Sequence, residues 1–315
     1  MAEPPGVTHS PFDITTMAEP PPKRKRPDSE AASDTIIRSE VWFEDGNLLV
    51  QVQTTQFRLF RGSLAFHSPK LKALIEALPE NAALVLDDNP ADWEHVSKKL
   101  FHHAYPDKEL LPFVVIEAFA RIGKKYEIQW LFNRARKLLN AAYPSVLDVW
   151  LSAHLNHTGA TAHALESSIL ARVVDLPHLL PVAFWYLTFS HRISGLVTAR
   201  AAALSEEDKK SILDGFRKRL HAESSTTLKW LQAEGSDKCK KQGGSECTVA
   251  RLKLFASITK NSRGQRGWSW LTSWEKDLCE PCIAAGKALH TAGVRDLWEC
   301  LPSLFNLPPW HELRK

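Results

Sequence analysis

The cysteines of this chain are confined to one stretch near its C-terminal end. All 5 cysteines of the 315 residues lie between Cys239 and Cys300. Four of them follow the spacing Cys-x7-Cys-x31-Cys-x2-Cys, at Cys239, Cys247, Cys279 and Cys282. A Cys-x-x-Cys pair presents two thiolates to one zinc ion, and a second pair completes a tetrahedron. The spacing therefore predicts one structural zinc site, although the first pair is wider than the usual spacing of about two to four residues.

Two other interpretations of the cysteines stay open. One is a set of reduced thiols, some of them buried. The other is a redox-active pair at Cys279 and Cys282, a mechanism that needs the first cysteine at the N-terminus of a helix that follows a strand. Residues 274–278 have helical spacing instead, so the redox pair is the less favoured alternative. Cys300 is left over, and we expect it to pack among apolar side chains.

The first 38 residues differ in composition from the rest of the chain. Seven of the 19 prolines precede Ile36, and large apolar residues are few. Such a segment cannot bury enough surface to offset the entropy lost on ordering, so we expect residues 1–38 to be disordered. Between two prolines of this tail stands the basic run Lys23, Arg24, Lys25 and Arg26. It predicts nuclear import, and a solvated charge run without a targeting role is the alternative.

No stretch of the chain has the length and apolar character of a membrane span. The longest apolar stretch without Asp, Glu, Lys or Arg covers 16 residues, 176–191, and contains Pro177 and Pro181. A span needs about 18 apolar residues. The N-terminus has no apolar segment typical of a secretory signal. We therefore expect a protein of the nucleus, the cytoplasm or both, where cysteines stay reduced or bind metal rather than form disulfides.

Residues 39–143 have the pattern of a small α/β unit. Apolar residues flanked by turn signals predict two antiparallel strands at 48–52 and 56–60. Ser68 before Pro69 is typical of a helix start, with serine as the N-cap and proline in the first position. The other expected elements are a short helix at 61–66, a strand at 82–86, and helices that begin at Pro90, at residue 112 and at residue 127.

This order of elements resembles the BTB/POZ fold, a small α/β interaction domain. The residues that carry the resemblance are Phe57, Leu59, Phe60-Arg61, Leu64-Ala65, Ser68 and Leu71. The resemblance implies a homodimer that also binds other proteins, with a cullin-type ubiquitin ligase scaffold among the implied partners. Two positions depart from the family pattern: Phe60 stands where histidine is usual, and Asn47 where many members have aspartate. Both departures weaken the implied co-repressor groove and leave the expected fold unchanged.

The end of the chain extends the resemblance. The segment Trp298-Glu299-Cys300-Leu301-Pro302, followed by Phe305 and Trp310, is similar to the end of a group of BTB proteins from mushroom-type fungi. Members of that group often also carry the spaced cysteines. Six of the 11 tryptophans lie between Trp230 and Trp310, which marks the last third of the chain as distinct in composition.

These patterns together predict an α+β fold in four parts. Residues 144–234 contain only helical patterns, so they form an all-helical extension of the first unit. The expected order is a disordered tail at 1–38, a BTB/POZ-like domain at 39–143, the helical extension at 144–234, and a cysteine- and tryptophan-rich module at 235–315.

The sequence favours a protein-interaction adaptor over an enzyme. It contains no P-loop, dinucleotide-binding glycine motif, nucleophile elbow or helical histidine pair. The alternative function is a nuclear DNA- or chromatin-binding regulator that uses the zinc-like module. Its basic residues would be the run Arg217–Arg219 or the loop with Lys260, Arg263 and Arg266. Cations near the C-terminal end of a helix interact favourably with the helix dipole, which accounts for the run Arg217–Arg219 without nucleic acid. The other basic residues fit a solvated loop. Nucleic acid is therefore the less expected partner.

Overall fold

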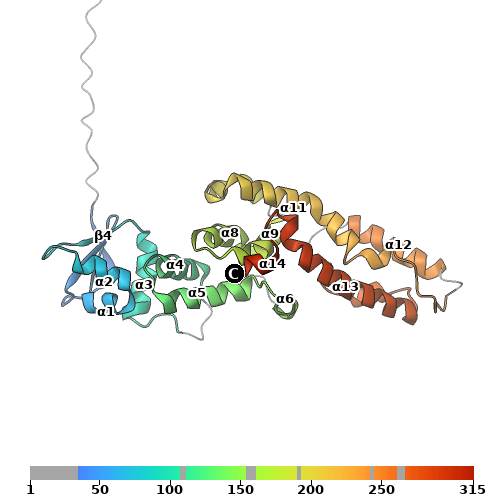
Figure 1. Cartoon of the computed structure of the whole chain (residues 1–315), viewed down its shortest axis with the longest axis horizontal. Helices are drawn as coiled ribbons and strands as arrows, with labels where there is room; N and C mark the ends of the chain where they lie inside the picture. Colours follow the sequence, from blue (N-terminus) through green and yellow to red (C-terminus); the bar gives the residue numbers. More distant parts are fainter. Residues whose placement is uncertain (1–34, 107–110, 154–160, 190–192, 242–244, 261–266) are drawn as a thin grey trace, which may run out of the picture. The chain divides into compact units, whose positions relative to one another are not determined.

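The alternating apolar residues of the first third of the chain form one four-stranded sheet (Figure 1). In the computed structural model the strand order is β1–β3–β2–β4. The strands are β1 (Ile37–Trp42), β2 (Leu48–Val52), β3 (Thr55–Leu59) and β4 (Leu84–Leu86). The structure describes residues 35–106, 111–153, 161–189, 193–241, 245–260 and 267–315. Residues 1–34 of the predicted disordered tail, with its basic run, therefore lie outside the described residues. The predicted boundary at residue 38 was wrong, because Ile37 and Arg38 already belong to β1.

The sheet combines one predicted hairpin with two parallel pairings. β2 and β3 are antiparallel, with Val52 opposite Thr55 across a two-residue turn, so the expected hairpin is present. β1 runs parallel to β3, and β4 runs parallel to β2. Val50 on β2 and Phe57 on β3 are fully buried, whereas Leu49 is half-buried. One face of the sheet thus belongs to the core, as the two-residue period of strands requires.

Five helices complete this first unit. They are α1 (Arg61–His67), α2 (Pro69–Glu76), α3 (Pro90–Phe101), α4 (Phe113–Lys125) and α5 (Gln129–Ala142). Ser68 caps α2 as expected, because its Oγ accepts a hydrogen bond of 2.9 Å from the backbone N–H of Leu71. The same hydroxyl donates to the carbonyl of Tyr126, which follows α4. One buried serine therefore begins α2 and ties it to the end of α4.

The middle of the chain is helical, as predicted. It contains α6 (Leu147–Ala153), α8 (Ala164–Val173), η2 (Pro177–Leu179), α9 (Leu180–Leu187), η3 (Ser194–Val197), η4 (Ala199–Ala203) and α11 (Glu206–Ser225). Every residue of α9 is buried. Ser205 caps α11 by accepting from the N–H of Asp208 at 3.1 Å. The run Arg217–Arg219 was expected at the end of this helix, but α11 continues to Ser225 and its last turn contains no basic residue.

The last part of the chain packs into the same core as the middle. Its elements are η5 (Lys229–Leu231), α12 (Ser245–Lys260), η7 (Thr272–Glu275), α13 (Glu280–Leu304) and α14 (Trp310–Leu313). Trp150, Trp185, Trp268 and Trp298 form a chain of ring contacts with centroids 5.5 to 6.0 Å apart. The tryptophans on both sides of residue 235 therefore share one apolar cluster, and residues 36–315 form one compact unit.

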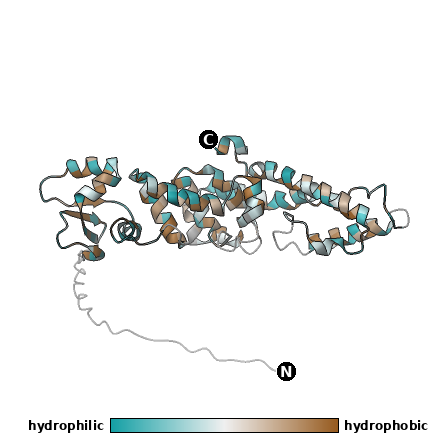
Figure 2. Cartoon of the chain, turned by 90° about the horizontal axis from the view of Figure 1, so that it is seen from below, coloured by the Kyte–Doolittle hydropathy of each residue, from teal (hydrophilic) through white to brown (hydrophobic). Residues whose placement is uncertain are grey.

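The helices present both polar and apolar residues along their length. In Figure 2 the ribbons of most helices alternate between teal and brown, as expected of helices that bury one stripe and expose the other. Within the described ranges no helix combines the length and the apolar character needed to cross a membrane.

Candidate functional site

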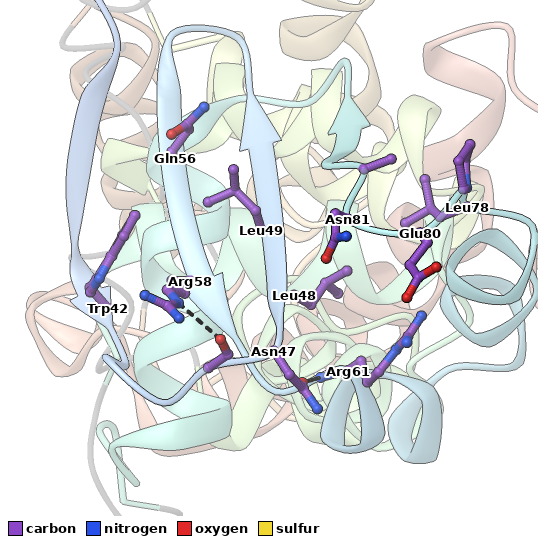
Figure 3. Close-up of a pocket in the computed structure, with 13 residues that line it drawn as sticks. Trp42, Asn47, Leu48, Leu49, Gln56, Arg58, Arg61, Leu78, Glu80 and Asn81 are labelled. Carbon is purple, nitrogen blue, oxygen red and sulfur yellow. Dashed lines mark hydrogen bonds between the residues drawn. The ribbon is translucent and has the colours of Figure 1, made fainter.

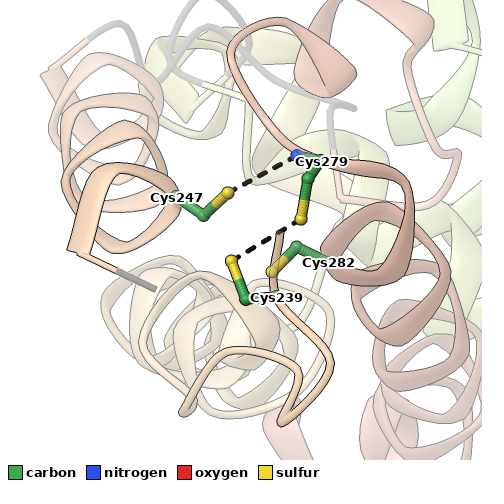
Figure 4. Close-up of side chains that lie close together, drawn as sticks. All are labelled: Cys239, Cys247, Cys279 and Cys282. Atoms are coloured by element: carbon green, nitrogen blue, oxygen red, sulfur yellow. Dashed lines mark hydrogen bonds between the residues drawn. The ribbon is translucent and has the colours of Figure 1, made fainter. Parts of the chain in front are cut away.

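Four of the five cysteines converge on one point. The Sγ atoms of Cys239, Cys247, Cys279 and Cys282 all lie within 4.8 Å of one another, and Figure 4 shows them gathered from three segments of the chain. A zinc ion about 2.3 Å from each of four sulfurs would hold the sulfurs about 3.8 Å apart. The Sγ atoms of Cys239 and Cys279 are 3.6 Å apart. The described structure thus assembles a four-thiol cluster that could hold one metal ion.

Each of the four cysteines lies at the start of a helix or in a short turn. Cys279 is the N-cap of α13, and Cys282 is the third residue of that helix, so both thiols face the same end. Pro281 stands between them in the first turn, where its missing N–H costs no hydrogen bond. Cys247 lies in the first turn of α12. Cys239 lies in the turn after η5, where its N–H donates to the carbonyl of Ser236 at 3.0 Å.

The cluster is enclosed and receives backbone hydrogen bonds. Cys247 is fully buried, and its Sγ accepts from the N–H of Cys279 at 3.4 Å. The backbone N–H of Lys240, and after it that of Cys282, lower the pKa of Cys279 to about 6. Burial raises the pKa of Cys247, and it raises that of Cys282 to about 12. Of these three cysteines, Cys279 therefore loses its proton most readily, and a bound cation would have to displace the protons of Cys247 and Cys282.

A buried arginine that the sequence analysis did not single out lies beside the cluster. Arg251 is 4% exposed and stands four residues after Cys247 on α12, so both residues face the same side of the helix. Its Nη1 donates to the carbonyls of Trp230, at 3.2 Å, and Ala233. Its Nη2 donates to Oγ1 of Thr248 at 3.2 Å. The helical spacing from Cys247 was the signal in the sequence that could have drawn attention to Arg251.

The segment before Cys279 differs from the expectation. Residues 274–278 were expected to be helical, but η7 ends at Glu275 and Asp277 has a positive φ of 65°. The positive φ interrupts the helical backbone, so α13 is a separate helix. Cys279 does stand at a helix N-terminus, which a redox pair would require, although a 3₁₀ turn rather than a strand precedes it. Cys239 and Cys247 lie in the same cluster. A redox pair uses only two cysteines, so the presence of these two favours a metal site over a redox pair.

The fifth cysteine stands apart from the cluster. Cys300 lies on α13 and packs against the main apolar core, as expected. Its thiol donates to the carbonyl of Leu297 at 3.3 Å. Burial raises the pKa of this thiol, so it stays protonated at neutral pH.

The residues expected to form the interaction motif divide between core and surface. They are Asn47, Phe57, Phe60, Arg61, Leu64 and Ser68. Phe57, Leu64 and Ser68 are fully buried, so they stabilise the fold and cannot reach a partner. Asn47 is exposed, and its Oδ1 accepts from the backbone N–H of Arg61 at 2.9 Å, at the start of α1. Phe60 is half-buried, with its ring centroid 4.9 Å from that of Phe43.

The solvent-facing side of the sheet carries a groove of about 870 Å³ (Figure 3). Asn47 and Arg61 line it, together with Trp42 and Arg58 of the sheet. Nε of Arg58 donates to the carbonyl of Gly46 at 2.9 Å, which fixes the guanidinium along one wall. Glu80 lines the groove as well, so the groove presents two cations, one carboxylate and an aromatic ring.

A group of aromatic rings is exposed on the first unit. Phe66 on α1 is 84% exposed, and its ring contacts that of His67, whose ring in turn contacts Trp130 on α5. Nε1 of Trp130 donates to Nδ1 of His67 at 3.2 Å, which leaves the imidazole proton on Nε2. Burial lowers the pKa of His67, so this ring is neutral at pH 7. We call Phe66, His67 and Trp130 the Phe66 patch.

The basic run on α11 does not form a continuous cationic surface. Arg219 is buried and donates to the carbonyl of Thr188 at 3.0 Å. Lys218 donates to Oδ1 of Asn306 at 3.2 Å. Of the other predicted nucleic-acid contacts, Lys260 ends α12, whereas Arg263 and Arg266 lie outside the described residues.

No protein-family model, no curated protein and no solved structure matches this chain.

Proposed function

We propose that this protein is a non-enzymatic interaction adaptor that carries one structural zinc ion. The Phe66 patch is the observation that supports the adaptor role. An aromatic side chain exposed to the extent of Phe66 gains little from the fold of its own chain. Aromatic residues are enriched at protein interfaces, where a few of them supply most of the binding energy.

The partner at the Phe66 patch is a second copy of this chain. The resemblance of residues 39–143 to BTB/POZ domains supports a homodimer, and the three rings provide an apolar surface that a symmetric contact can cover twice. Other proteins then bind elsewhere, with the groove beside Arg58 and Arg61 as the candidate surface for an acidic segment. The resemblance adds a cullin scaffold as a proposed partner, and the basic run in the tail supports a nuclear location.

Sedimentation of the full chain tests the homodimer. We expect the wild-type chain to dimerise at micromolar concentrations and Phe66→Ala to weaken the dimer by about 30-fold, the effect of losing one strong interface contact. The matched control is Val197→Ala, because Val197 is 89% exposed in η3, outside the first unit, and should leave the dimer unchanged. A wild-type chain that stays monomeric at about 100 μM would contradict the proposal, since such a weak contact is below the range of specific complexes.

The chemistry of the four-thiol cluster supports zinc as the metal. Four sulfur ligands favour zinc over magnesium or calcium, which prefer oxygen. Four protein ligands also leave no position for a water or substrate, so the ion would stabilise the fold rather than catalyse a reaction. Metal analysis of protein purified without chelator should find about one zinc per chain. Protein that contains no zinc and gains none on zinc addition would overturn the assignment.

A further inference from the structure

We infer that Arg251 supplies the buried positive charge that balances the four-thiolate zinc centre. The inference rests on the proposed zinc site and assigns a role to a residue that does not touch the metal. Four thiolates and one divalent cation leave an excess charge of about −2 in the site. Removing such charge from water is unfavourable unless an opposite charge or hydrogen bonds compensate it.

Arg251 is placed to provide that compensation. A Cβ atom built on Gly235 would be 3.4 Å from Nη2 of Arg251 and 3.7 Å from Sγ of Cys282. The guanidinium nitrogen and the sulfur are therefore within about 7 Å of each other, close enough for an electrostatic interaction at the reduced effective dielectric of a protein. Both atoms border the space that a side chain at Gly235 would occupy. The buried arginine thus lies next to the cysteine cluster, with no side chain of residue 235 near the two atoms.

The other contacts of Arg251 leave its charge unbalanced. Its guanidinium donates to two backbone carbonyls and one hydroxyl, and within the described part of the chain no carboxylate pairs with it. Its Nε is buried without a hydrogen-bond partner. A buried arginine without an acidic partner is costly on its own. Negative thiolates in the neighbouring cluster would offset the cost of burying the guanidinium. The buried arginine and the thiolate cluster would therefore stabilise each other.

The lysines near the cluster are less suited to this role. Lys240 is exposed and pairs with Glu280 at 3.4 Å. Nζ of Lys241 donates to the carbonyl of Asp277 at 2.8 Å in a solvent-exposed hydrogen bond, while the residue as a whole is half-buried. Water screens both ammonium groups, whereas the guanidinium of Arg251 lies in the interior. Among the cations described near the site, Arg251 therefore acts on the cluster with the least screening.

Zinc competition against a chromophoric chelator, with the full chain, tests the inference. We expect Arg251→Gln to weaken zinc binding by about 10- to 100-fold, the effect typical of losing a partner of the ligand shell. Arg251→Lys keeps the charge and should bind zinc within about threefold of the wild-type chain. The matched control is Lys253→Gln, which removes an exposed charge from the same helix and should change nothing.

The relative zinc affinities of the two Arg251 variants show whether the charge of Arg251 or its hydrogen bonds support zinc binding. Lysine has one terminal nitrogen, so it cannot reproduce the bonds of Nη1 to two carbonyls and that of Nη2 to Thr248 together. A purely structural role therefore predicts that Arg251→Lys is as weak as Arg251→Gln or weaker. That order, or an unchanged affinity in Arg251→Gln, would overturn the inference. If circular dichroism finds Arg251→Gln unfolded, Arg251→Lys alone decides, and a tenfold loss of affinity in it would count as failure. A wild-type chain that binds no zinc would overturn the zinc proposal itself, and the inference with it.

Discussion

Gly293 of α13 lies directly against the end of α11, at the carbonyl of Thr226. A Cβ atom on Gly293 would stand 2.3 Å from that carbonyl oxygen and 2.8 Å from the backbone nitrogen of Thr227. Neither atom belongs to a side chain that could rotate away. The two segments therefore approach each other at a distance that only glycine permits.

Gly293→Ala should destabilise the protein strongly for this reason. We expect the free energy of unfolding to fall by about 3 kcal/mol, the upper part of the usual range for overpacking, because backbone must move to admit the methyl group. Urea denaturation measures the change. Gly62→Ala is the control: a Cβ on Gly62 meets no atom within 4 Å, and the residue lies inside α1. That control should raise the stability by about 0.5–1 kcal/mol, and equal losses in both variants would contradict the close approach.

Cys247→Ser should abolish zinc binding, because a neutral hydroxyl is a poor ligand for zinc. In zinc at several hundred times its dissociation constant, the variant should lose about 3–4 kcal/mol of stability relative to the wild-type chain. Metal analysis and thermal unfolding with and without added zinc measure both effects. Cys300→Ser provides the comparison, since Cys300 packs against the core on α13 away from the cluster. It should keep its zinc, and loss of zinc in both variants would count against the assigned ligands.

Acid should weaken the fold partly through His178. Burial, and after it the charges of Arg136 and Arg314, lower the pKa of His178 below its ordinary value of 6.5. The neutral ring is thus favoured in the folded state, and Nε2 lies 2.8 Å from Oδ1 of Asn140. The stability that this preference contributes is complete above pH 6.5 and is lost as the pH falls towards the lowered pKa.

His178→Gln keeps a donor for Asn140 and removes the titration. Urea denaturation at about pH 7.5 and about pH 5 should therefore give a larger loss of stability for the wild-type chain than for the variant. The other histidines and the metal centre are common to both proteins, so their effects cancel in the difference. A variant that loses as much stability as the wild-type chain over this range would contradict the role of His178.

The basic run of the tail should direct the protein to the nucleus. Replacing Lys23, Arg24, Lys25 and Arg26 with alanine in a fluorescent fusion should move the protein from nucleus to cytoplasm, because an import receptor loses its basic side chains. The control replaces the same number of exposed lysines, at Lys72, Lys137, Lys253 and Lys276. It removes the same charge and should leave the location unchanged. Nuclear accumulation of the tail variant would argue against an import signal.

Local signals in the sequence predicted local structure well. Ser68 and Ser205 begin helices because a serine hydroxyl can accept from an N–H three residues on, a contact that depends on few residues. The hairpin of β2 and β3 follows from alternation around a short turn. The Cys-x-x-Cys pair brings two thiols to the start of one helix by the same kind of short-range geometry.

Long-range relations were beyond the sequence patterns. The meeting of Cys239 and Cys247 with the pair on α13 was predicted from the chemistry of a four-sulfur zinc site, not from local structure, since 31 residues separate Cys247 from Cys279. The burial of Arg219 depends on its packing over the rings of Trp185 and Phe189, which no local pattern around residues 217–219 indicates. The position of Arg251 beside the cluster likewise depends on contacts between distant segments.

The parallel pairing of β1 with β3 has a consequence for the order of folding. β1 precedes β2 in the chain, but its partner β3 becomes available as a folded strand only within the hairpin that β2 and β3 form. A two-residue turn lets that hairpin close within microseconds, whereas a parallel pair must close a longer loop. We therefore expect the strand that leaves the ribosome first to be incorporated last, so that the nascent sheet exposes the edge of β3 until Ile37–Trp42 docks.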